Sequence, residues 1–188
     1  MTLSNGHARR FLVAALAAVG LLVPAVAPAA AGTKPCRYRD ASPAHVDHAK
    51  IRDATLCLLN RRRAAHGARK LRSNQRLAAA ARKHAADMVR RRYFDHTAPG
   101  GVSFVERIMR QDYVHAGQGW TLGENLAWGS YQLATPASIV RSWMHSPPHR
   151  ANILNRRFHE IGIGVANGAP TAGVQNAATY ATSFGTRL

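Results

Sequence analysis

The 188-residue chain carries 26 Lys and Arg residues against 9 Asp and Glu residues, for a formal net charge of +17. A charge of this sign suits encounters with polyanions such as anionic wall polymers, acidic lipid headgroups or nucleic acid. The arginine runs 61–63 and 90–92 are consecutive, however, so on a helix they fan around its axis, which excludes a single basic stripe. We therefore favour solvated basic faces over a dedicated polyanion site.

The first 31 residues have the pattern of a secretory signal peptide. His7, Arg9 and Arg10 form a positively charged start, residues 11–23 are an apolar run, and residues 29–31 are a small-residue cleavage site. The apolar run is shorter than the roughly 20 residues that a membrane-spanning helix needs. We predict a cleaved signal peptide (1–31) and a secreted, extracellular protein with no transmembrane segment after cleavage. An uncleaved anchor is the alternative.

The remaining chain has the length of one domain, predicted at residues 46–188 behind an N-terminal tail at 32–45. Its two cysteines are Cys36 in the tail and Cys57 in the first predicted helix. Because export implies an oxidising compartment, we predict that a Cys36–Cys57 disulfide ties the tail to that helix. Two separate buried thiols are the alternative.

Two long helices come first. Ile51, Ala54 and Leu58 recur at helical spacing in residues 46–66, and Gly67 follows as a C-cap. The second helix begins after a capping Ser73 or Asn74 and ends near Tyr93. Its predicted apolar face is Leu77, Ala81, Ala85 and Met88. His84 lies beside this face, and we interpret it as a partly buried, hydrogen-bonded structural histidine and not as a ligand.

Two further helices and a proline break follow. Residues 103–106 have the capping-box pattern for a third helix. Thr135-Pro136 begins a fourth helix, which carries Trp143. Because Pro147 and Pro148 disfavour helix before them, that helix is predicted to end near Ser146.

The last part of the chain changes period. Ile161, Ile163 and Val165 alternate with small residues and predict a half-buried strand, and residues 178–184 predict a second strand that pairs with it. Helices followed by strands predict an α+β fold with a small antiparallel sheet covered by helices.

Three side chains form the candidate site: His96, Glu124 and His149. Two imidazoles and one carboxylate have the composition of a catalytic metal site with an open position, and also of an acid–base set. Glu124 is flanked by apolar residues and a glycine, so it is either paired or exposed, because an unpaired buried carboxylate is too unfavourable. A Ser146–His149 nucleophile pair is an alternative, but serines at helix ends are mostly caps. G-x-S-x-G, P-loop, G-x-G-x-x-G and C-x-x-C motifs are absent from the sequence.

Several stretches, in one order along the chain, resemble the bacterial branch of the CAP superfamily (cysteine-rich secretory proteins, antigen 5, pathogenesis-related 1), also called the SCP domain. The resemblance covers residues 51–185. The stretches that carry it are residues 58–63 (LLNRRR), 77–88 (LAAAARKHAADM), 94–96 (FDH), 123–127 (GENLA), 143–154 (WMHSPPHRANIL) and 160–165 (EIGIGV).

The resemblance implies an α-β-α sandwich with a surface cleft lined by histidines and acidic groups. By motif, the cleft histidines fall on His96 and His149 and the acid on Glu124. In some relatives this set holds a divalent cation, which for this chain would be Zn or Mg at His96, Glu124 and His149. Many eukaryotic relatives have a second acid where this chain has Ser146, so the ligand set is incomplete.

Three functions follow from these residues. The first is a non-enzymatic extracellular binding module with His96, Glu124, His149, Ser146 and Asn125 around its ligand. The second is a buried polar network that only organises the fold. The third is a metal- or His-assisted, peptidase-like hydrolase at the cell envelope, with His96 or His149 as general base. The expected partner is a cell-wall or anionic envelope polymer or lipid and not a specific nucleic acid, and the chain is expected to be a monomer.

Overall fold

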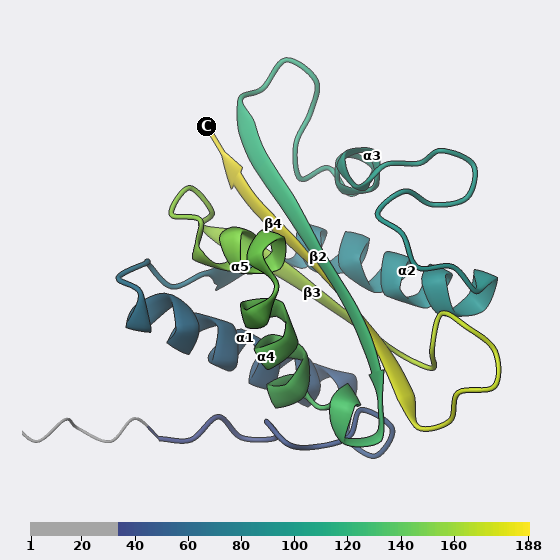
Figure 1. Ribbon diagram of the computed structural model, residues 1–188. Coiled ribbons are helices and arrows are strands. Elements are labelled where there is room, and N and C mark those ends of the chain that lie inside the picture. The colour runs from purple at the N-terminus through teal and green to yellow at the C-terminus, as the bar shows by residue number, and fades with distance from the viewer. Residues whose placement is uncertain (1–33) are drawn as a thin grey trace, which may run out of the picture. The chain divides into compact units, whose positions relative to one another are not determined.

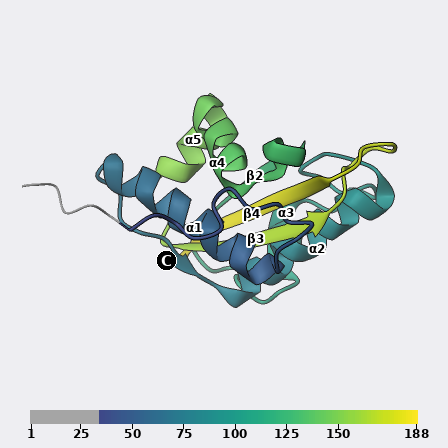
Figure 2. The same ribbon diagram turned by 90° about the horizontal axis from the view of Figure 1, so that it is seen from below.

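A four-stranded sheet lies between two layers of helices in the computed structural model (Figures 1 and 2). The model describes residues 34–188, so the predicted signal peptide lies outside the described residues. The helices are α1 His48–Ala65, α2 Gln75–Arg91, α3 Phe104–Met109, the 3-10 helix η1 Tyr131–Ala134, α4 Pro136–His145 and α5 Pro147–Leu154. The strands are β1 Arg72–Ser73, β2 Trp120–Ser130, β3 Glu160–Asn167 and β4 Ala177–Arg187.

The sheet has the order β1-β3-β4-β2, and its three long strands are antiparallel. The pairing of β3 with β4 was predicted, whereas β2 was not. The two-residue strand β1 adds a short parallel pairing to β3 that the sequence did not indicate. Helices α1, α4 and α5 cover one face around Trp143, and α2 and α3 cover the other. The α+β prediction is thereby confirmed.

Close packing against α2 buries β3 on both faces, so its prediction as a half-buried strand was wrong. The isoleucines of β3 face the core with Trp143, and Gly162 and Gly164 face α2. A Cβ atom on Gly162 would lie 2.0 Å from the carbonyl carbon of Leu77 in α2. The small residues therefore mark close contact between helix and strand, not solvent exposure.

Local capping signals placed the helix ends correctly. The Asn74 side chain caps α2, Ser103 and Glu106 form the reciprocal capping box of α3, and α4 ends at His145. The sequence missed α5, which begins directly at the proline pair. Proline is compatible with the first turn of a helix because the N–H groups there have no partner within the helix. Pro147 and Pro148 thus end one helix and begin the next.

The tail is attached as expected, because Cys36 and Cys57 form a disulfide. The interpretation of the first arginine run as solvated was wrong for Arg63, which is fully buried. The buried face of α1 is Ile51, Ala54, Thr55, Leu59 and Arg63, and the predicted Leu58 is partly buried against the same core. Within residues 34–188, no helix is long and apolar enough to cross a membrane.

Candidate functional site

Glu124 lies in the middle of β2, where the sequence analysis had assigned no secondary structure. Full-length pairing with β4 makes this stretch a strand, and Glu124 lies opposite Ser183. Because successive side chains of a strand point to opposite faces, Glu124 points toward α2 and α3 while Asn125 points toward α5. The Glu124 side chain is only 2% exposed, so its charge needs partners inside the protein.

Arg107 of α3 is the main partner of this carboxylate. Its Nη2 atom lies 2.9 Å from Oε1 and 2.8 Å from Oε2 of Glu124. The same guanidinium donates through Nη1 to the carbonyl oxygen of His96, at 2.8 Å. Arg107 therefore holds both the buried carboxylate and the loop that carries the first candidate histidine.

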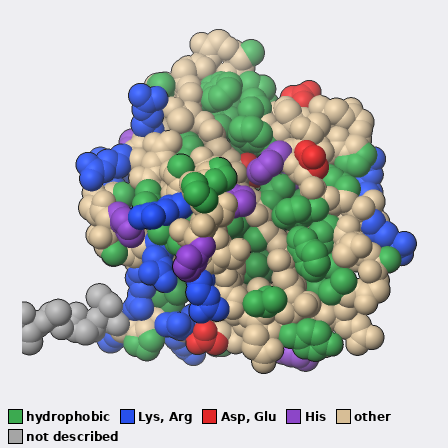
Figure 3. All heavy atoms as spheres, in the orientation of Figure 1, with side chains coloured by type: hydrophobic (Ala, Val, Ile, Leu, Met, Phe, Trp, Pro, Cys, Tyr) green, Lys and Arg blue, Asp and Glu red, His purple; other side chains and the backbone are tan. Residues whose placement is uncertain are grey.

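His96 completes the environment of the carboxylate. Its Nδ1 lies 2.9 Å from Oε1 of Glu124, and because a carboxylate only accepts, Nδ1–H is the donor. The His96 side chain is 52% exposed, so its Nε2 edge is open to solvent. Figure 3 shows histidine side chains gathered near the middle of this face, beside an acidic side chain that is mostly covered.

His149 comes from the first turn of α5. Its Nδ1 lies 2.8 Å from the Ser146 hydroxyl, and its carbonyl oxygen accepts from Nδ2 of Asn125 at 3.0 Å. Asn125 is in turn fixed by Asn152, whose Nδ2 donates to its Oδ1 at 2.9 Å. Asn125 is fully buried, so in this structure it positions His149 instead of contacting a ligand itself.

The two imidazoles differ in their electrostatics. The hydrogen bond to Glu124 is the main cause that raises the pKa of His96 above its ordinary value. Burial lowers the pKa of His149, and the charge of His96 lowers it further. Between the two pKa values the site therefore carries one cationic and one neutral imidazole.

We expect a histidine NMR pH titration to show this difference directly. The ring signals of His96 should change at a higher pH than those of His149, because only His96 has a carboxylate partner. Coincident midpoints, or a higher midpoint for His149, would contradict the hydrogen bonding described for this site.

The residues present do not fit a resident divalent cation. Both oxygens of Glu124 accept hydrogen bonds from the Arg107 guanidinium, which already neutralises the carboxylate. Among the described residues, no group of three or more His, Cys, Asp and Glu side chains is arranged to hold a metal ion. Ser146, at the position of the second acid, is hydrogen-bonded to His149. The predicted Zn or Mg site at His96, Glu124 and His149 therefore gains no support from this arrangement.

His84 lies behind the carboxylate and is 1% exposed. Its Nε2 donates to the carbonyl oxygen of Asp95 at 3.0 Å and lies 4.0 Å from Oε1 of Glu124. Burial lowers its pKa, which favours the neutral form. Its interpretation as a hydrogen-bonded structural histidine agrees with these contacts, although it is fully buried and not partly buried as predicted.

Sequence reasoning found the carboxylate and both imidazoles but missed Arg107. The structure joins His96 directly to Glu124, and it couples His149 to His96 through their charges. The sequence did indicate that Glu124 has a partner, because a carboxylate in apolar surroundings needs a cation unless it is exposed. Arg107 lies in a short helix 17 residues before Glu124, a separation at which sequence alone does not pair side chains.

The α-β-α arrangement and the two motif histidines around the G-E-N strand define a CAP domain. The profile of the cysteine-rich secretory protein family (CAP) matches residues 56–181. The chain belongs to this family.

The relatives identified by sequence are bacterial. The chain is 36% identical over 107 residues to YkwD and 33% identical over 110 residues to the membrane protein YlbC, both uncharacterized proteins of Bacillus subtilis. These matches cover 57% and 58% of this chain but only 39% and 30% of the relatives, so the chain spans a minor part of their length.

Solved structures confirm the fold. An extracellular SCP-domain protein of Bacillus anthracis superposes with a TM-score of 0.58 at 24% identity, covering 74% of this chain and 43% of that one. An outer surface protein of Borrelia burgdorferi superposes with a TM-score of 0.62 at 20% identity, covering 76% and 97%. At these identities the likeness establishes the fold alone.

Proposed function

We propose that this chain is a secreted, non-enzymatic binding module that holds a polar ligand between His96 and His149. The observation that carries the proposal is the state of Glu124, whose two oxygens are already bonded to Arg107 and His96. A general base or a metal ligand needs an accessible oxygen, and this carboxylate is 2% exposed with both oxygens already hydrogen-bonded. Its remaining effect is to fix the ring of His96.

The imidazoles are then the groups left to meet a ligand. His96 presents its Nε2 edge to solvent, and His149 is half-buried with its Nδ1 turned to Ser146. A neutral imidazole offers one donor and one acceptor, and a protonated one offers two donors. Such a pair suits a ligand that carries hydroxyl, amide or anionic groups.

The secreted location is part of the proposal. It is supported by the signal-peptide pattern of residues 1–31 and by the disulfide, which is typical of oxidising compartments. The names of the two structural neighbours, an extracellular protein and an outer surface protein, agree with it. The expected partners therefore belong to the cell envelope.

The test is ¹⁵N NMR of the imidazoles during titration with soluble envelope fragments, namely N-acetylated glycan oligomers and wall peptides. A ligand at this site should shift the His96 and His149 signals and leave those of the exposed His45 and His115 unchanged. His96→Ala should abolish the shift at His149. If all four histidines respond alike, or if neither site histidine responds to any fragment, the proposal is wrong.

A hydrolase is the second candidate, favoured by the 2.9 Å contact between His96 and Glu124. A carboxylate that orients an imidazole is the arrangement by which enzymes prepare a general base. In this case the fragments of the titration would be cleaved, and His96→Ala and Glu124→Gln would both stop turnover. Intact fragments after prolonged incubation would exclude this activity for those substrates.

A further inference from the structure

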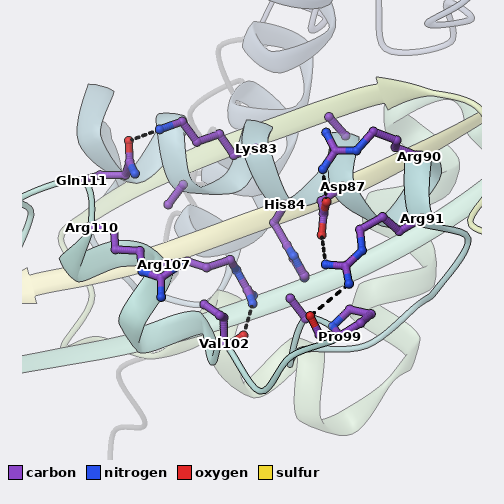
Figure 4. Close-up of a pocket in the computed structure, with 13 residues that line it drawn as sticks. Lys83, His84, Asp87, Arg90, Arg91, Pro99, Val102, Arg107, Arg110 and Gln111 are labelled. Atoms are coloured by element: carbon purple, nitrogen blue, oxygen red, sulfur yellow. Dashed lines mark hydrogen bonds and ion pairs between the residues drawn. The ribbon is translucent and has the colours of Figure 1, made fainter.

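A groove of about 620 Å³ lies between α2 and α3 (Figure 4). One wall is the outward face of α2, with Lys83, Asp87, Arg90 and Arg91 at helical spacing. The opposite wall comes from α3 and from the residues just before and after it, including Val102, Arg110 and Gln111. Neither His96 nor His149 is among its lining residues.

The groove has an excess of positive charge. Five basic side chains line it: Lys83, Arg90, Arg91, Arg107 and Arg110. Two carboxylates form ion pairs with them: Asp87, which pairs with Arg90 and Arg91, and Glu124, which pairs with Arg107. The Glu106 carboxylate of α3 also interacts with Arg110 and Arg107, so five basic side chains stand against three carboxylates and two positive charges are left in excess. Lys83 donates to the neutral amide of Gln111.

The charges stand at two ends of the groove. Figure 4 shows Lys83, Gln111 and Arg110 at one end, Arg90 and Arg91 at the other, and His84 between them. Lys83 and Arg90 are seven positions apart in α2, a distance of about 10 Å along the helix axis. The rest of the lining is small and uncharged. It consists of Ala80, Ala86, Ala98, Pro99 and Val102.

We propose that this groove binds an aliphatic phosphodiester polymer, with one phosphate at each charged end and the intervening carbons over the alanines. Two anion positions about 10 Å apart require a ligand with linked anionic groups, whereas a phospholipid headgroup supplies one phosphate. Arginine forks match the paired oxygens of phosphate. The lining contains no Phe, Tyr or Trp ring on which a nucleobase would stack, and its His84 ring is buried, which disfavours a single-stranded nucleic acid.

On this proposal, some of the basic residues form a binding groove, whereas the sequence alone favoured basic surfaces that only face solvent. This inference does not depend on the proposed function, because the groove is lined by residues other than His96 and His149. The two can be tested separately on the same protein.

The test is fluorescence polarisation with a labelled short poly(glycerol phosphate) and the domain from residue 35 onward, which includes Cys36. Lys83→Gln/Arg110→Gln removes two exposed charges at one end of the groove. We expect about tenfold weaker binding, because two charged contacts to phosphate are lost. Ala86→Glu, which places a carboxylate on the α2 wall of the groove, should weaken binding as well.

Matched controls carry the same charge changes elsewhere. Arg62→Gln/Lys70→Gln and Ala64→Glu alter exposed residues outside the groove lining. They should change the affinity by less than about twofold, because charges farther away than about 10 Å are screened at 0.1 M salt. Melting curves of all variants show whether they are folded. Equal weakening by controls and groove variants would overturn the proposal, as would failure of the wild type to bind.

Competing ligands complete the experiment. Equal or tighter binding of oligothymidylate or of poly-L-glutamate would overturn the assignment to an aliphatic phosphodiester. Binding to phosphatidylglycerol vesicles without binding to the soluble polymer would assign the groove to a lipid headgroup and overturn the polymer. Preference for poly(glycerol phosphate), reduced by the groove variants alone, is the result that the structure predicts.

Discussion

Arg107→Met should lower the free energy of unfolding by about 3–5 kcal/mol, the loss typical of a buried ion pair that has lost one partner. The variant leaves the Glu124 carboxylate, 2% exposed, with His96 as its remaining charged hydrogen-bond partner. It also removes the donor to the carbonyl oxygen of His96, which frees the loop. Urea unfolding followed by circular dichroism measures the effect.

The control for this prediction is Arg110→Met, three residues further on and exposed to solvent. It should change the free energy of unfolding by less than about 0.5 kcal/mol. The double variant Arg107→Met/Glu124→Gln removes both charges and should lose less stability than Arg107→Met alone. A single Arg107→Met variant as stable as the Arg110→Met control would show that the pair does not hold the site together.

Arg63→Met should be destabilising to a similar degree, by roughly 4 kcal/mol, because it leaves several buried carbonyl groups without donors. The guanidinium donates to the carbonyl oxygens of four residues, at distances of 2.6–3.1 Å. These residues are Arg69, Ile153, Asn155 and Phe158. Arg63 thereby joins the end of α1 to the chain that leads from α5 into β3.

Arg62→Met is the natural comparison, since it changes the neighbouring, exposed arginine of the same run. Thermal unfolding of the two variants should differ strongly, with Arg62→Met close to the wild type. Equal melting temperatures would mean that the carbonyl groups around Arg63 find other donors or water. This pair of variants tests the correction that the structure makes to the interpretation of the run.

Local signals in the sequence predicted much of the fold. Asn74, the Ser103–Glu106 box and Thr135-Pro136 act through hydrogen bonds or dihedral angles within a few residues, so their meaning does not depend on the tertiary structure. The CAP resemblance, carried by ordered motifs, added the sandwich arrangement. Both predictions are confirmed.

The missed elements depend on contacts between distant parts of the chain. β2 contains Gly123, Glu124 and Asn125, residues with little preference for strands, and its conformation is fixed by pairing with β4. Gly162 and Gly164 indicated a solvent-facing side until α2 was seen to pack on them. In each case the tertiary partner decided the conformation or the burial.

The burial of Arg63 follows the helical spacing of apolar residues in α1. Ile51, Thr55, Leu59 and Arg63 follow one another at intervals of four and form the buried face of α1. The period therefore contained the signal that Arg63 points inward. Its charge argued against burial, because buried arginines are rare. The carbonyl groups that accept from Arg63 belong to Arg69 and to residues about 90 positions away, which the sequence does not bring together.

The candidate site was predicted in composition but not in connectivity. His96 and Glu124 were identified as site residues, and their direct hydrogen bond is a finding of the structure. Arg107 changes the expected chemistry of Glu124. The carboxylate, a candidate metal ligand or base, is instead neutralised by Arg107 and holds the ring of His96. The function proposed from the structure follows from that change.

The central claim is that His96 and His149 are there to meet a ligand and not to hold the fold. The most direct measurement is the melting temperature of His96→Ala/His149→Ala beside the wild type. Glu124 keeps its bonds to Arg107 in the variant, so we predict a melting temperature within about 4 °C of the wild type. A loss of more than about 10 °C would show that the imidazoles form a structural network, and it would contradict the claim.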